Sequence, residues 1–325
     1  MTNNVSQAVL FADEISIINI VFISFYACSS MKNFEKPVLA NKNEGYFFKV
    51  RDGLQLFIYD YMPIENYMAT IFIISGITGI NHHSEKDLID ILSNNENRVV
   101  VIHPRGTGYS EGARGDISNF EDFINDYEEI ITNDVDYCSK EHKMFLFGHS
   151  MSTAVLLAVA ENLKNISGAV LVNPPYIQKE AKGMSPSLGQ YIKYACYYLF
   201  AKHTPIVNMA GNPSEIENEE DRKESETRNN DPLLVKYFSL YMMTESKKLM
   251  DRMVDYSREA DYPLLLIYGK KDNLIDKNSC DLIFENWNSP NKKFVAVENG
   301  THGNSSILLA NEAVRKWITN NINKN

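Results

Sequence analysis

The fold of this chain is decided by the stretch Phe145-Leu146-Phe147-Gly148-His149-Ser150-Met151-Ser152. Its first three residues are apolar and predict a buried strand, and the apolar residues of 154–160 predict a helix that begins directly after the serine. A serine between a strand and a helix is typical of a nucleophile elbow, which needs small residues two positions either side of the serine. Gly148 and Ser152 occupy those positions, although the usual pattern G-x-S-x-G has glycine at the second. The stretch therefore predicts that Ser150 is a nucleophile.

Short apolar runs recur on both sides of this stretch, with helical stretches between them. A hairpin is predicted first, from 46–50 through a turn at Asp52-Gly53 to 54–61. The later runs are 69–74, 99–102, 144–147, 169–172, 263–268 and 294–297. Such runs predict a doubly wound α/β fold with a mostly parallel sheet covered on both faces, and ligands then bind at the carboxyl ends of the strands.

Composition restricts the partners of the chain. Its 325 residues, of which 44% are hydrophobic and 23% charged, predict one core domain with an insertion. The net charge of −10 argues against a nucleic-acid partner. The cysteines are far apart and form no C-x-x-C pair, so they are expected to be isolated thiols; they are Cys28, Cys138, Cys196 and Cys280.

The regular alternation of strands and helices stops between Val172 and Pro263. We therefore predict an α/β domain over 45–325 with a helical cap inserted at about 176–245. The aromatic residues of the cap are expected either to form its core or to line a tunnel for an acyl chain; they are Tyr191, Tyr194, Tyr197, Tyr198 and Phe200. The acidic run 212–230 is expected to be a flexible, solvated loop without function.

The first 44 residues are predicted to be an extension of the domain. Their apolar segment, 15–27, is too short to cross a bilayer comfortably and ends before Cys28 in a sequence like a lipoprotein cleavage box, but it has no basic start. It is interpreted as a lipid-anchored export signal or as an extension that is disordered or touches a membrane, and Met31 is an alternative start of translation. We expect a cytoplasmic protein with membrane association, or an exported one if the segment is a signal.

A serine nucleophile needs a histidine base and a carboxylate that orients the base, in the chain order Ser, Asp or Glu, His for this type of fold. Asp272 follows the predicted strand 263–268, and His302 follows the predicted strand 294–297. Both loops leave the carboxyl end of the sheet, where Ser150 is expected. Asp276 is the alternative acid, but it lies four residues deeper toward the next helix.

An oxyanion hole needs two backbone N–H donors, one after the nucleophile and one from the loop after the third strand. Met151 supplies the first and Ile77, in the loop 75–79, supplies the second. His82 and His83 follow this loop, and without a carboxylate cluster nearby they indicate a structural or rim position and not a metal site. We expect no metal and no cofactor.

The chain resembles the monoacylglycerol lipase and lysophospholipase branch of the α/β-hydrolases, also described as serine aminopeptidase S33-like. The resemblance rests on the elbow and on Arg105-Gly-Thr-Gly-Tyr-Ser-Glu-Gly-Ala-Arg-Gly115, similar to R-G-x-G-x-S-x-G-x-R-G, with Phe120 and Asp126 at the usual spacing. The loop from Ser75 is also similar, although the family commonly has His-Gly where this chain has Ser-Gly. The two arginines of the motif are expected to be structural ties.

The resemblance implies two-step acyl transfer on a single-chain lipid ester, a monoacylglycerol or a lysophospholipid, with transient membrane contact through the cap or the N-terminus. A short-chain carboxylesterase is the alternative within the fold. An aminopeptidase would need acidic groups at the pocket to hold a substrate amine, and the cap acids are expected in a solvated loop. A binding protein without catalysis is disfavoured, since Ser150, Asp272 and His302 are all present.

Overall fold

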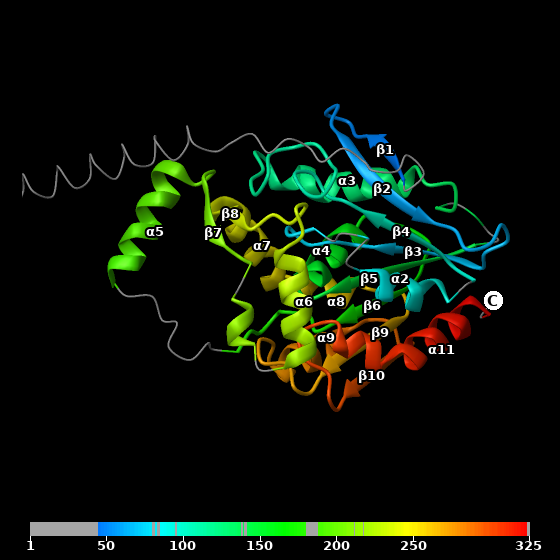
Figure 1. Ribbon diagram of the computed structural model, residues 1–325. Helices are drawn as coiled ribbons and strands as arrows, with labels where there is room; N and C mark the ends of the chain where they lie inside the picture. Colours follow the sequence, from blue (N-terminus) through cyan, green and yellow to red (C-terminus); the bar gives the residue numbers. More distant parts are fainter. Residues whose placement is uncertain are drawn as a thin grey trace, which may run out of the picture.

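The computed structural model describes residues 45–79, 82, 85–94, 96–137, 139, 142–179, 188–210, 212–216 and 218–323. An eight-stranded sheet forms its centre, in the order β1-β2-β4-β3-β5-β6-β9-β10 (Figure 1). The strands are β1 (Tyr46–Lys49), β2 (Gln55–Tyr61), β3 (Ala69–Ile73), β4 (Arg98–Ile102), β5 (Lys143–His149), β6 (Ile166–Val172), β9 (Leu264–Gly269) and β10 (Lys292–Val297). Each predicted run corresponds to one of these strands.

In this sheet the six neighbouring strands β4, β3, β5, β6, β9 and β10 are parallel. The pairings of β1 with β2 and of β2 with β4 are antiparallel. The parallel strands β3 and β4 are buried along their whole length, which explains why they read as continuous apolar runs and not as alternating ones. The predicted doubly wound α/β architecture is confirmed.

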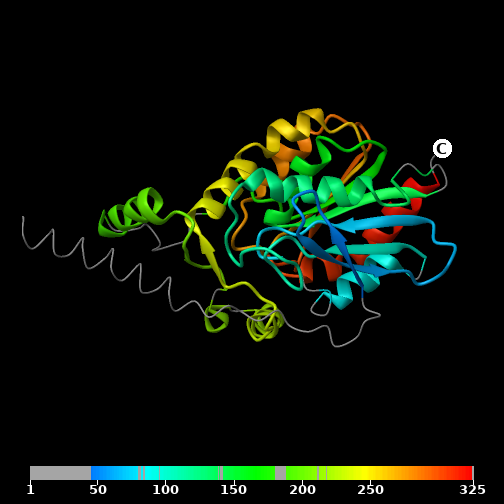
Figure 2. The same cartoon turned by 90° about the horizontal axis from the view of Figure 1, so that it is seen from above.

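Two layers of helices cover the sheet, because successive strand residues point to opposite faces. Ile71 and Ile73 of β3 belong to one apolar cluster, and Phe72 belongs to the other. The first face is covered by α2 (Lys86–Ser93), α10 (Ser305–Leu309) and α11 (Asn311–Ile322). The second is covered by α3 (Phe120–Thr132), α4 (Met151–Ala160), α8 (Met253–Glu259) and α9 (Lys277–Asn286), and Figure 2 shows the two layers from above.

The helix after the elbow, α4, has an unusual environment. Residues 152–160 are all buried, because the sheet and the helices α3, α8 and α7 (Leu240–Asp251) all pack against α4. A helix that is buried on every side must be apolar all round, and this explains the unbroken run of small and aliphatic residues after Ser150.

The segment between β6 and β9 contains α5 (Leu188–Ala201), β7 (Pro205–Asn208), the 3-10 turn Pro213–Glu215, α6 (Glu219–Asn229), β8 (Tyr237–Ser239) and α7 (Leu240–Asp251) before α8. It includes a two-stranded sheet of β7 and β8, which the sequence did not predict. Part of the acidic run is the helix α6, whose first turn is capped by the side chain of Asn218, so the prediction of a loop there is wrong. The predicted cap limits, 176 and 245, remain a prediction.

Helix α5 projects away from the rest of the molecule (Figures 1 and 2). Tyr194, Tyr198 and Phe200 are exposed, by 42%, 39% and 83%, so these aromatic residues form neither a cap core nor an enclosed tunnel in this structure. Across the part of the chain that the structure describes, no helix combines the length and the apolar composition that a membrane crossing requires.

The glycine-rich motif 105–115 joins the core to this inserted segment. Arg105 donates from Nε and Nη2 to the carboxylate of Asp126, at 2.6 and 2.7 Å, and from Nη1 to Asp52. Arg114 donates to the carbonyl of Leu233, at 2.6 Å, in the segment between α6 and β8. Both arginines therefore make the structural ties that the sequence indicated.

Three sequence-based interpretations concern residues outside the described part. They are the N-terminal extension 1–44 with Cys28, the thiol of Cys138, and His83. The other two cysteines, Cys196 and Cys280, are free thiols.

Candidate active site

Ser150 lies at the strained turn between β5 and α4. Its φ of 53° and ψ of −130° are rare for a residue with a side chain, and its N–H donates to the carbonyl of Val172 at 2.9 Å. The turn is tight enough that a Cβ on Gly148 would lie 3.1 Å from the backbone carbon and oxygen of Ser152. Glycine at 148 therefore lets the chain double back and present the Ser150 side chain above the sheet.

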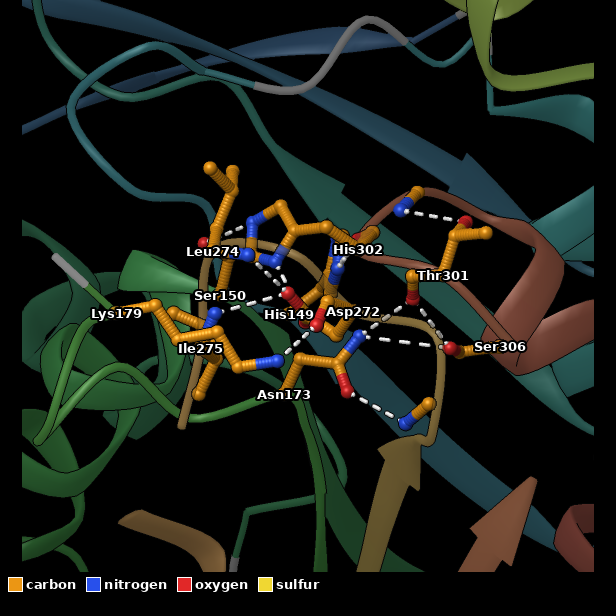
Figure 3. Close-up of polar contacts among 12 residues, drawn as sticks. His149, Ser150, Asn173, Lys179, Asp272, Leu274, Ile275, Thr301, His302 and Ser306 are labelled. Carbon is orange, nitrogen blue, oxygen red and sulfur yellow. Dashed lines mark hydrogen bonds and ion pairs between the residues drawn. The ribbon is translucent and has the colours of Figure 1, made fainter. Parts of the chain in front are cut away.

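Three of the predicted residues meet in one chain of hydrogen bonds (Figure 3). His302 Nδ1 donates to Asp272 Oδ2 at 2.8 Å, which leaves Nε2 as the acceptor for the Ser150 hydroxyl at 2.9 Å. The three side chains come from the loops after β5, β9 and β10, as the sequence predicted. A base that accepts from a hydroxyl and is itself oriented by a carboxylate can activate that hydroxyl for nucleophilic attack.

Asp272 is held ionised although it is almost completely buried. Burial alone would raise its pKa, but the hydrogen bond and charge of His302 and the N–H groups of Ile275 and Leu274 outweigh it, so that its pKa lies below the ordinary value. Those N–H groups donate to Oδ1 at 2.9 and 2.7 Å. The alternative acid, Asp276, instead caps the start of α9 by accepting from the N–H of Asn278.

The chain that leaves β6 for the inserted segment runs along the Asp272 loop. Lys179 donates from Nζ to the carbonyl of Asp272 at 2.5 Å and from its backbone N–H to the carbonyl of Leu274 (Figure 3). Gln178 forms an isolated bridge with Ile275. The inserted segment is therefore anchored on the loop that carries the acid.

His149, directly before Ser150, contacts the backbone of His302 and was not singled out from the sequence. Its Nε2–H donates to the carbonyl of His302 at 2.6 Å. Burial, followed by the charge of His302, lowers the pKa of His149 to about 3, so that its ring is neutral near pH 7. This contact holds the backbone of the His302 loop against the elbow.

The predicted oxyanion donors lie beside a direct contact between their two loops. Gly76 N–H donates to Ser152 Oγ at 2.8 Å, so the loop that carries Ile77 is bonded to the helix turn that carries Met151. Tyr127 fixes the residue before Gly76, because its hydroxyl donates to Ser75 O at 3.0 Å and accepts from Ser75 N–H. The serine at 152 thus provides a hydrogen bond that glycine could not make.

His82, which follows this loop in the chain, is buried. Its Nδ1 lies 3.2 Å from Nε2 of His103, and its ring stacks on Tyr59 with a centroid distance of 4.3 Å. This is the structural position that the sequence indicated, inside the protein and not at the rim. Within the described residues, His, Cys, Asp and Glu side chains form no group of three or more that could hold a metal ion.

The acidic helix α6 contacts the His302 loop, contrary to the expectation that the acidic run lacks a role. Asn304 donates its N–H to Glu224 Oε2 at 3.0 Å and its side-chain Nδ2 to Glu85 Oε2 at 3.1 Å. Burial and then the charge of Glu224 raise the pKa of Glu85 to about 7. These contacts could not be predicted from periodicity or spacing, because they join residues 80 and 219 positions apart in the chain.

Comparisons with known proteins identify the family of the chain. The model of the family described as serine aminopeptidase, S33, matches residues 66–305. The chain is 27% identical to the monoglyceride lipase of Rattus norvegicus over 258 residues, which are 77% of this chain and 80% of the relative. It is 25% identical to the mouse monoglyceride lipase over 261 residues, with the same coverage of 77% and 80%.

Solved structures with similar folds include two lipases. The crystal structure of a soluble variant of the monoglyceride lipase of Saccharomyces cerevisiae, in complex with a substrate analogue, superposes with a TM-score of 0.70 at 16% identity and covers 88% of this chain and 99% of that one. The monoacylglycerol lipase of Paleococcus ferrophilus gives a TM-score of 0.65 at 19% identity, covering 82% and 98%. These identities are low, so the structures establish the likeness of fold.

The hydroxyl of Ser152 yields a first prediction. Ser152→Ala leaves the buried Gly76 N–H without its acceptor, which should lower the free energy of unfolding by about 1–3 kcal/mol. The matched control is Ser257→Ala, since that buried hydroxyl only donates to the carbonyl of Met253 in its own helix. Thermal unfolding followed by circular dichroism should show a larger drop in Tm for Ser152→Ala, and equal drops would contradict the role assigned to this bond.

Glu85 yields a prediction about pH. The pKa of Glu85 is about 7 in the folded protein and 4.5 ordinarily, so the folded state binds more protons than the unfolded state between these values. The ionisation of Glu85 should therefore lower the free energy of unfolding as the pH rises through this window. Glu85→Gln keeps an acceptor for Asn304 but cannot ionise. Its Tm should match that of the wild type near pH 4.5 and exceed it above pH 7. The same change at the exposed Glu65 is the control, and a Glu85→Gln difference that does not vary with pH would refute the prediction.

Proposed function

Because the chain belongs to the serine aminopeptidase S33 family and has the α/β-hydrolase fold, we propose that it is a serine hydrolase that cleaves carboxylic esters of single-chain lipids, monoacylglycerols or lysophospholipids, through an acyl-enzyme. The observation that carries the proposal is the continuous chain of hydrogen bonds from Ser150 through His302 to Asp272. The monoglyceride lipases to which the chain is similar support the choice of a lipid ester.

In the first step, Ser150 Oγ attacks the ester carbonyl while its proton passes to His302 Nε2. Asp272, ionised and held by two backbone N–H groups, stabilises the imidazolium that forms. The Met151 N–H, at the first turn of α4 where helical N–H groups lack an intrahelical acceptor, and the Ile77 N–H stabilise the oxyanion. Return of the proton to the leaving alcohol gives the acyl-enzyme, and water attacks it in the second step with His302 again as the base.

A membrane surface is the place where such lipid substrates reside, and α5 is the element suited to contact it. Leu199 and Phe200, at the end of α5, are exposed by 74% and 83% on a helix that projects from the core. We assign the transient membrane contact to this end of α5. The net charge of −10 favours a zwitterionic over an anionic surface.

Aminopeptidase activity is the second candidate, and one observation favours it. The acidic groups of α6 are not in a solvated loop but beside the base: a Cβ on Gly303 would lie 2.7 Å from Asp221 Oδ1 and 3.0 Å from Glu224 Oε2. Carboxylates there are suited to hold a substrate amine. Glu224, however, already accepts from the Asn304 N–H, which leaves Asp221 as the group that would bind the amine.

The proposed reaction is tested by product release from four substrates: a monoacylglycerol, a lysophospholipid, a short-chain p-nitrophenyl ester and an aminoacyl anilide. We expect the wild type to release fatty acid from the long-chain lipids, and Ser150→Ala to lower kcat by about 10⁴-fold or more while the fold remains intact. Ser257→Ala, at a buried serine of α8, is the control and should keep wild-type turnover.

Each other outcome points to a different function. Release from the short ester alone would replace the lipase by a general carboxylesterase. Release from the anilide alone would favour the aminopeptidase. Turnover that survives in Ser150→Ala, or a folded wild type that is inactive on all four substrates, would refute the serine hydrolase.

Membrane contact through α5 gives a separate prediction. Phe200→Asp should weaken binding to phosphatidylcholine vesicles by about tenfold, since an apolar side chain that would enter the lipid becomes charged. Hydrolysis of a monoacylglycerol in such vesicles should fall with it, while hydrolysis of the soluble short ester should stay unchanged. Val135→Asp is the control, because Val135 is also exposed, by 82%, but follows α3; equal losses in both variants would contradict a role of α5.

A further inference from the structure

Asn173, the first residue after β6, has an uncommon backbone and a fully buried side chain. Its φ is 47°, in the left-handed region that asparagine tolerates better than other residues with a side chain. Its backbone N–H donates to the carbonyl of Ile267 in β9 at 3.0 Å. Proline follows it at 174 and 175, so the chain turns away from the sheet here.

The carboxamide of Asn173 connects two loops that are separate in the sequence (Figure 3). Its Oδ1 accepts from the N–H of Gly269 at 2.9 Å, and its Nδ2 donates to the carbonyl of Thr301 at 3.0 Å. Gly269 is the last residue of β9, directly before the loop of Asp272, and the Asp272 N–H donates back to its carbonyl. Thr301 directly precedes His302.

The loop that carries Ser150 is bonded to Val172, the neighbour of Asn173. Ser150 N–H donates to the carbonyl of Val172, the residue before Asn173. Two consecutive residues at the end of β6 therefore contact the backbone of all three loops that carry Ser150, Asp272 and His302.

We propose that Asn173 is a positioning residue that fixes the distance between the Asp272 loop and the His302 loop, and so keeps the base aligned between the acid and the nucleophile. This inference rests on the function proposed above. The position requires a donor and an acceptor on one short side chain, together with a backbone at positive φ. A carboxamide meets these requirements, whereas a carboxylate of the same size lacks the donor once it is ionised.

Loss of the carboxamide should not by itself unfold the protein. The Thr301 carbonyl keeps a second donor, the Ser306 hydroxyl at 2.6 Å, and the Lys271 N–H still bonds the Gly300 carbonyl between the two loops. The defect should therefore appear as misalignment, which lowers kcat and changes KM little, because Asn173 contacts the loops and not the substrate.

The diagnostic variant is Asn173→Asp, with kcat measured on a short-chain p-nitrophenyl ester from about pH 6 to about pH 8. A protonated carboxyl can donate to the Thr301 carbonyl as Asn173 does, and burial favours this neutral form. An ionised carboxylate has no proton to donate, so it loses this hydrogen bond and its charge repels the carbonyl oxygen. The ratio of variant to wild-type kcat should fall by about tenfold between these two pH values.

The titratable groups around Asn173 are shared by both proteins. On the strand ends and loops bonded to Val172 and Asn173, they are His149 at the end of β5, Asp272 with Lys270 and Lys271 on the loop after β9, and Glu298 and His302 on the loop after β10. Taking the ratio at each pH removes their common contribution and leaves the effect of the introduced carboxyl. Asn165→Asp is the matched control, because Asn165 also has a positive φ, 62°, but is exposed; its ratio should stay near one throughout.

Asn173→Gly tests the same inference without a new charge. Glycine tolerates the positive φ but makes neither bond, so we expect kcat to fall about tenfold or more, with KM within about twofold of the wild type and a circular dichroism spectrum like that of the wild type. Wild-type kcat in Asn173→Gly, or a ratio for Asn173→Asp that does not change with pH, would overturn the positioning role. An inactive wild type whose Ser150 does not react with a fluorophosphonate would instead overturn the proposed function.

Discussion

The parallel register of β5, β6, β9 and β10 is the constraint on which the rest of this structure depends. His149 pairs with Val172, Val172 with Ile267, and Gly269 with Val297, so these strands end at nearly the same level. Loops that leave such strands must begin side by side. Three segments spread over about 150 positions of the chain therefore bring Ser150, Asp272 and His302 together. His302 lies 2.9 Å from the Ser150 hydroxyl and 2.8 Å from the Asp272 carboxylate.

Hydrogen bonds between the loops then hold them in place at the strand ends. The His149 ring holds the His302 carbonyl, the Asn173 carboxamide joins the other two loops, and Ser152 bonds the Gly76 N–H. His149 and Asn173 lie at or next to a strand end, and Ser152 lies in the first turn of α4; each bonds a backbone group that would otherwise lack a partner in a buried place. The chain thus uses Ser152, its departure from the usual elbow pattern, as part of the support of the site.

The inserted segment packs on the core through apolar residues such as Phe238 and Met242, and it reaches the His302 loop through polar contacts. Glu224 of α6 and Glu85 before α2 both bond Asn304, two residues after His302, and burial raises the pKa of both carboxyl groups. Contacts of this kind depend on the protonation of the carboxyl groups. Leu199 and Phe200 instead lie exposed at the end of α5, the helix that projects from the rest of the molecule (Figure 1). The segment accordingly combines a polar attachment near His302 with an apolar surface away from it.

The sequence by itself determined the strands of the central sheet and the chain order of the candidate catalytic residues, because local patterns indicate both. The strands, the elbow at Ser150 and the choice of Asp272 over Asp276 follow from apolar runs, turn residues and the position of each residue after its strand. Only the tertiary structure decided that Asn173, His149 and Glu224 contact the loops of the site, and that the acidic run forms a helix beside His302. These contacts depend on strand order, register and burial, which join distant segments and leave no periodic pattern in the chain.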